Sequence, residues 1–135
     1  MYLAHHYPDD YERCVLIGRS HVCRRCLVLY PIAFVVMVGT LAIHPGSGVD
    51  LAMIVLLPLP AVIELVLENV GVLTYDPRRQ IAVTVPLAIG LGRGFAVYLG
   101  DNTSVSFWGP VIVYVAVTGG AVAWRHWREA RAREA

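Results

Sequence analysis

Long apolar runs alternate with short polar segments along this chain. Residues 27–43, 51–73, 81–99 and 107–124 form the four apolar runs. At about 1.5 Å of rise per residue, helices of these lengths reach roughly 25–35 Å, the thickness of the hydrocarbon core of a bilayer. The segments between the runs are short and rich in Gly, Pro, Asp and Asn, which favour turns. The pattern predicts an all-α fold, an integral membrane bundle of four transmembrane helices.

The composition supports this class. Of the 135 residues, 57% are hydrophobic and only 16% are charged, and the mean hydropathy is +0.60. Water-soluble domains average about 25% charged residues. A soluble monomer of this composition could not cover its apolar side chains with polar surface, so we expect an integral membrane protein made of one compact unit.

Arginine placement predicts the orientation of the bundle. All eleven basic residues are arginines, and ten of them lie before the first run, between the second and third runs, or after the fourth. The positive-inside rule then places both termini in the cytoplasm of a multi-pass protein of the prokaryotic inner (plasma) membrane. The net charge is only +1, which gives no electrostatic argument for a nucleic-acid partner. We divide the chain into a cytoplasmic Cys/His segment (1–26), the transmembrane domain (27–124) and a basic cytoplasmic tail (125–135). The tail is expected to form a helix that lies along the membrane surface.

A cysteine and histidine cluster precedes the first run. Cys14, His21, Cys23 and Cys26 make a Cys₃His set, in which the Cys-x₂-Cys spacing lets two thiolates reach one ion. His5 and His6 could replace one of these ligands. Zinc is the expected cofactor and an iron–sulfur cluster the second choice, because zinc accepts mixed nitrogen and sulfur ligands. The alternative interpretation is a group of unligated thiols in a reducing compartment.

Two stretches near this cluster resemble a family of small bacterial and archaeal membrane proteins that has no assigned activity. The family signature is Cys-His-x-x-Pro, then Arg-Ser, then Cys-x-Arg-Cys-x-Gly-x-Tyr at the start of a helix. Residues 5–8 (His-His-Tyr-Pro) are similar to its first part and residues 23–30 to its last, while Pro60 and Glu64 are similar to a Pro-x-x-x-Asp motif. The resemblance is loose, extends over residues 5–68, and implies a four-helix membrane protein with a cytoplasmic motif.

The chain departs from that signature at three positions. Ala4 stands where the family has its first cysteine, Cys14 follows Arg13 where a serine is usual, and Val28 replaces the glycine. Cys14 is therefore expected either to substitute for the missing thiol or to belong to a site of different geometry.

Ionisable residues also occur inside the apolar runs. Glu64 and Glu68 lie four residues apart on one helical face, with Asn69 beside them, and Arg93 lies in the third run. Charges at such depth cost roughly 2.5–3.5 kcal/mol each, so they should face the bundle and pair. We predict a Glu64–Arg93 ion pair, with Glu68 and Asn69 nearer the cytoplasm. The group would either line an ion path or ligand pocket, or fix the register of the helices.

The sequence favours a non-enzymatic membrane protein whose metal site stiffens the cytoplasmic face, as an accessory or interaction subunit. Its expected partners are membrane lipid and either another protein or further copies of the chain. One alternative is a small transporter or channel that uses Glu64, Glu68 and Arg93. The other is a membrane redox protein or metalloenzyme, which needs an open metal position or a coloured cofactor.

Overall fold

A computed structural model describes residues 13–43 and 47–134 of the chain. The described residues form two strands and five helices. These are β1 (Cys14–Ile17), β2 (Ser20–Cys23), α1 (Arg24–Ile43), α2 (Ser47–Leu56), α3 (Leu59–Val70), α4 (Pro77–Gly100) and α5 (Val105–Glu134). His5 and His6 lie outside the described residues.

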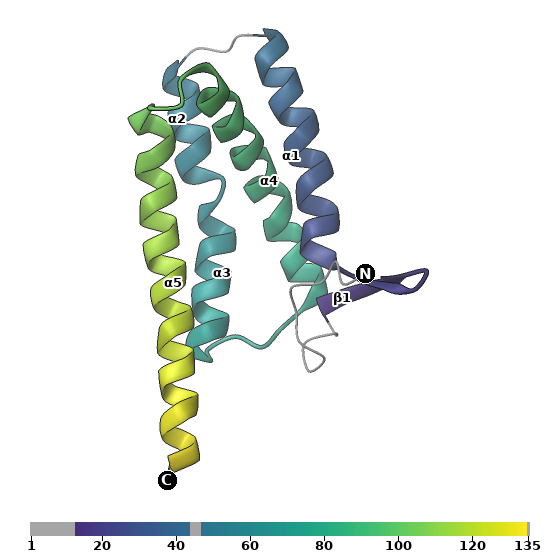
Figure 1. The fold of residues 1–135 in the computed structure, drawn as a ribbon, viewed down its shortest axis with the longest axis vertical. Helices are drawn as coiled ribbons and strands as arrows, with labels where there is room; N and C mark the ends of the chain where they lie inside the picture. Colours follow the sequence, from purple (N-terminus) through teal and green to yellow (C-terminus); the bar gives the residue numbers. More distant parts are fainter. Residues whose placement is uncertain (1–12, 44–46, 135) are drawn as a thin grey trace.

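Four helical segments in the described part are long and apolar enough to cross a membrane, which confirms the predicted number. The second of them, Gly48–Val70, comprises α2 and α3 together. Helix α1 packs mainly against α4, and α3 packs against both α4 and α5, whereas α4 and α5 contact each other little. In Figure 1 the helices run side by side, with β1, β2 and the end of α5 at the same end of the bundle. We call this the hairpin end.

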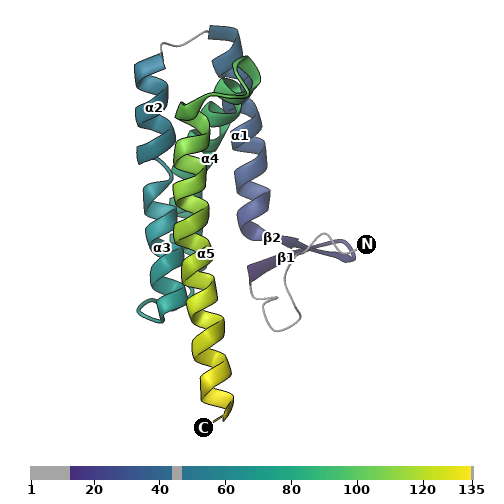
Figure 2. The same ribbon diagram turned by 60° about the vertical axis from the view of Figure 1, so that its left-hand side comes forward.

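The β1–β2 hairpin was not expected from the hydrophobic pattern. Its strands are antiparallel, and Cys14 lies directly opposite Cys23. Gly18 opens the two-residue turn with φ +63°, a conformation that a side chain would disfavour. The hairpin projects sideways from the foot of α1 (Figure 2), and Leu16 and Ile17 near its tip are exposed.

Glycines on α4 bring neighbouring helices close together. A Cβ added at Gly92 would lie 2.5 Å from the Ala33 carbonyl oxygen of α1, and one at Gly90 would lie 3.0 Å from the Pro58 ring. Small residues at such contacts are typical of membrane helices, where close backbone packing replaces the hydrophobic effect. The Gly-x-x-x-Gly segment of α4 therefore packs helices.

The break between α2 and α3 falls at Leu57 and Pro58. Proline cannot donate the helical hydrogen bond, so carbonyls one turn earlier lose their partners. The Tyr114 hydroxyl of α5 donates a hydrogen bond to the Val55 carbonyl. A side chain of the neighbouring helix α5 thus supplies a hydrogen-bond donor to the backbone at the break and links α5 to α2.

Helix α5 continues without interruption from Val105 to Glu134. Its last turns extend the helix beyond the rest of the bundle (Figure 1), rather than turning aside as the expected surface helix would. Arg128 of this extension donates a 2.6 Å hydrogen bond to the Val70 carbonyl at the end of α3. Trp124 and Trp127 lie against each other with their ring centroids 5.1 Å apart. Arg128, near the start of the extension, therefore anchors it to the C-terminal end of α3.

Candidate functional site

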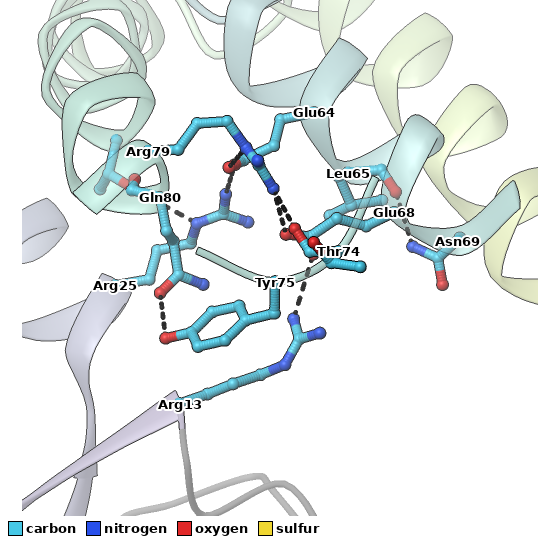
Figure 3. Close-up of polar contacts among 11 residues, drawn as sticks. Arg13, Arg25, Glu64, Leu65, Glu68, Asn69, Thr74, Tyr75, Arg79 and Gln80 are labelled. Carbon is cyan, nitrogen blue, oxygen red and sulfur yellow. Dashed lines mark hydrogen bonds and ion pairs between the residues drawn. The ribbon is translucent and has the colours of Figure 1, made fainter. Parts of the chain in front are cut away.

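Arginines and glutamates meet at the hairpin end of the bundle (Figure 3). Glu64 of α3 is only 4% exposed and accepts hydrogen bonds from two guanidinium groups. Arg25 Nη2 lies 2.9 Å from one of its carboxylate oxygens, and Arg79 Nε lies 3.0 Å from the other. Arg25 Nε also donates to Thr84 Oγ1 at 3.3 Å. Helices α1, α3 and α4 are joined through this one carboxylate.

Glu68 connects the same network to the hairpin. Its carboxylate lies 3.4 Å from Arg79 Nη2 and 3.3 Å from Arg13 Nη1. The Arg13 guanidinium also stacks over the Tyr75 ring, 4.7 Å from its centroid. Burial raises the pKa of the Tyr75 phenol, and the Arg24 and Arg13 guanidinium groups lower that pKa in part. The base of the hairpin is thereby tied to α3 and to the α3–α4 connection. We call Arg13, Arg25, Glu64, Glu68 and Arg79 the arginine–glutamate network.

The predicted Glu64–Arg93 ion pair is wrong. Arg93 Nη1 lies 3.2 Å from Asp50 Oδ1, towards the opposite end of the bundle, and Arg93 Nε contacts the Met53 sulfur at 3.2 Å. Asp50 is 6% exposed, and its Oδ1 makes no hydrogen bond among the described residues, so the contact is an ion pair without hydrogen-bond geometry. Helix α2 begins at Ser47, several residues earlier than expected, which draws Asp50 into the bundle beside α4.

Asn69 does not join the arginine–glutamate network. Its side-chain amide donates a 2.8 Å hydrogen bond to the Leu65 carbonyl of its own helix. The structure therefore separates the four predicted intramembrane residues into three places. Glu64 and Glu68 share the arginine–glutamate network, Asn69 bonds to the backbone of its own helix, and Arg93 pairs with Asp50.

The arginine partners of the glutamates were missed at the sequence level. Arg25 and Arg79 were assigned to loops, but they occupy the first turns of α1 and α4. Asp76 caps α4 by accepting a 2.9 Å hydrogen bond from the Arg78 backbone N–H. The Asp-Pro pair at residues 76 and 77 is a recognisable helix start, and it would have placed Arg79 within reach of the buried carboxylates.

The three cysteines gather where the hairpin meets α1. Cys14 and Cys23 are buried and directly opposite each other, a position where Cα atoms lie about 4.5–5.5 Å apart. Cys23 and Cys14 both lie near enough to Cys26 to influence its thiol. No disulfide joins them within the described part of the chain. We call Cys14, Cys23 and Cys26 the thiol cluster.

His21 lies two residues before Cys23 on β2, so both side chains are on the same face of the hairpin. Its directly opposite partner is Leu16 rather than a cysteine. Within residues 13–43 and 47–134, no group of three or more His, Cys, Asp and Glu side chains is arranged to hold a metal ion. The donors that do converge are thiols, the ligands that zinc and other borderline or soft ions accept. Zinc binding by Cys14, His21, Cys23 and Cys26 stays a prediction.

An apolar groove of about 280 Å³ lies between α3, α4 and α5. Its lining residues include Leu87 and Leu91 of α4 and Val111 and Val115 of α5. Arg25 is the one charged side chain among the described residues that line it. Its volume is near the lower end of the range for small-molecule sites, roughly 300–1,000 Å³.

Comparison with known proteins gives no match. No protein-family model, no curated protein and no solved structure is similar to this chain.

Proposed function

We propose that this chain is a non-enzymatic, multi-pass membrane protein whose thiol cluster binds zinc and holds the hairpin as a docking platform. The convergence of three cysteines from two strands and a helix start is the observation that carries this proposal. Cysteines that are merely scattered along a reducing-compartment protein have no reason to meet. Four ligands would close the coordination shell, which favours a structural ion over a catalytic one.

His21 is the proposed fourth ligand. It shares a hairpin face with Cys23, which lies two residues further along β2. An iron–sulfur cluster is the second choice of cofactor, because such clusters are usually held by four thiolates and the described chain offers three. His5 and His6, which lie outside the described residues, are further proposed donors.

The proposed orientation places the hairpin end in the cytoplasm. Ten of the eleven arginines of the sequence belong to segments that the structure gathers at this end, and the positive-inside rule assigns such an end to the cytoplasm. The hairpin, with the exposed Leu16 and Ile17 near its tip, and the protruding end of α5 would then face a cytoplasmic partner or a second copy.

Transport through the membrane is less well supported. That alternative needs carboxylates that can bind or release an ion, but Glu64 and Glu68 each contact two guanidinium groups. Carboxylates neutralised in this way are better suited to fixing helix positions than to carrying ions.

Metal content tests the proposal. Protein purified without affinity metals should contain about one zinc per chain, as expected for a single four-ligand site. The Cys23→Ser variant should lose that zinc, because Cys23 lies at the centre of the thiol cluster. Elemental mass spectrometry and a visible spectrum measure both points, with Ser20→Ala on the same strand as the matched control.

Each outcome bears on the proposal. Colourless protein whose zinc is retained in Ser20→Ala and lost in Cys23→Ser supports it. Iron together with visible absorbance would replace the zinc platform with a redox role. Wild-type protein without bound metal, after refolding with added zinc, would overturn the proposal.

A further inference from the structure

The apolar groove between α3, α4 and α5 takes no part in the proposed platform. It lies where α4 and α5 contact each other little, and Gly90 and Gly94 of α4 are among its lining residues. Its walls are apolar apart from Tyr114, Thr118 and Arg25. The Tyr114 and Thr118 hydroxyls are already bonded to backbone carbonyls. The groove therefore offers an apolar ligand almost no unpaired polar group.

The groove is elongated along the helices. Its lining residues on α5 run from Phe107 to Thr118, which at 1.5 Å per residue is roughly 16 Å. This is about half of the hydrocarbon thickness of a bilayer. A long, narrow apolar space in the membrane-spanning region suits an extended hydrocarbon chain better than a compact ring system.

One end of the groove carries positive charge. Arg25 uses Nη2 for Glu64 and Nε for Thr84, while its Nη1 makes no hydrogen bond with any described residue. Glu64 divides its single negative charge between Arg25 and Arg79. The Arg25 guanidinium is therefore only partly neutralised, and it can donate further charge-assisted hydrogen bonds in an environment of low dielectric constant.

We propose that the groove binds a long-chain carboxylic acid, with its carboxylate at Arg25 and its alkyl chain between α4 and α5. The apolar lining accommodates the chain, and Arg25, which lines the groove, receives the carboxylate, so charge complementarity selects an acid over a neutral chain of equal length. The acid enters from the bilayer.

The test compares an acid and a neutral chain on the intact protein. Full-length protein in nanodiscs of uncharged phosphatidylcholine is titrated with radiolabelled hexadecanoate and, separately, with hexadecanol. Loss of one charge-assisted hydrogen bond corresponds to roughly a tenfold weaker Kd, so the acid should bind about tenfold more tightly than the alcohol. Equal binding of the two would overturn the proposal.

Two variants with the same substitution locate the site. Val111→Trp places an indole in the groove and should weaken hexadecanoate binding by at least about tenfold. Val113→Trp adds the same indole on the exposed face of α5 and should leave the Kd unchanged. Both variants leave the arginine–glutamate network intact, so neither result depends on refolding the hairpin end. An equal loss in both variants would overturn the proposal.

Arg25→Gln should remove the preference for the acid while retaining weak binding of both chains. Zinc content and hexadecanoate binding are measured separately on the wild type, so the two proposals can fail separately. If the groove is instead covered by a second copy, the protein will be a dimer that binds no hexadecanoate and that Val111→Trp dissociates. That result would overturn the carboxylate proposal.

Discussion

Glu64 illustrates how one ionisable side chain is held inside an apolar bundle. A buried carboxylate is unfavourable unless it is paired and hydrogen-bonded, and Glu64 meets this need with one guanidinium on each oxygen. Both guanidinium groups come from the first turns of other helices, Arg25 from α1 and Arg79 from α4. Their long side chains reach down from the helix ends to the buried carboxylate.

Replacing this carboxylate by an amide should therefore be costly. Glu64→Gln leaves two guanidinium groups facing a neutral side chain, and removing one partner of a buried pair typically costs about 3–5 kcal/mol. We expect a loss of this size in the free energy of unfolding, measured by denaturant titration of the purified protein in mixed micelles.

Glu129→Gln is the matched control for that measurement. It breaks the exposed Arg125–Glu129 pair, four residues apart on α5, which solvent screens and which should contribute little to stability. Similar losses in the two variants would show that Glu64 is not a structural junction.

At the scale of the element, helix α4 organises the bundle through its glycines. Gly92 allows the backbone of α1 to approach, Gly90 packs against Pro58 at the α2–α3 break, and Gly94 packs against Phe107 of α5. Each of the three glycines thus faces a different neighbour. An added Cβ would separate the helices at Gly92 and press against Pro58 at Gly90, whereas at Gly94 it would meet Phe107 at 3.4 Å, an ordinary contact.

Gly92→Ala should destabilise the protein. The new Cβ would lie 2.5 Å from the Ala33 carbonyl oxygen and 2.9 Å from Val36 Cβ, so the backbone of α1 must shift. Overpacking of this kind costs about 1–3 kcal/mol. Gly39→Ala, on α1, has no atom within 4 Å of the added Cβ and should be neutral or stabilising, because alanine favours helix. Thermal unfolding in detergent, followed by circular dichroism, distinguishes the two, and equal melting temperatures would contradict the packing role of Gly92.

At the scale of the whole molecule, the bundle is strongly asymmetric. The hairpin, the arginine–glutamate network, the thiol cluster and the protruding end of α5 all lie at the hairpin end. Arg93 is the exception, paired with Asp50 towards the other end. A metal platform and its partner would therefore meet on one face of the membrane.

This asymmetry predicts the topology of the protein in the cell. A reporter that is active only in the cytoplasm should be active when fused after Ala135 and inactive when inserted at Asn102, between α4 and α5. The physical reason is that arginines flanking the spans are retained on the cytoplasmic side. Activity of the inserted reporter together with inactivity of the terminal one would reverse the proposed orientation.

The membrane class and the four spans follow from the sequence alone. Whether a segment is long enough and apolar enough to cross a bilayer depends only on residues that are neighbours in the sequence. The same holds for Glu64 and Glu68, since a charge in an apolar run must be paired wherever it lies. The β-hairpin could also have been predicted, because Gly18 lies in a turn between two four-residue strands. The sequence analysis instead treated the cysteines of this segment as metal ligands.

Only the tertiary structure decided which groups meet. Arg93 was matched to Glu64 because both lie inside apolar runs, but the early start of α2 brings Asp50 beside Arg93. The Tyr114 hydroxyl donates a hydrogen bond to the Val55 carbonyl, although the two residues are almost sixty positions apart in the sequence. No local pattern indicates that contact. Pairing inside a bundle depends on which helix faces pack together, and that is a property of the whole fold rather than of any one segment.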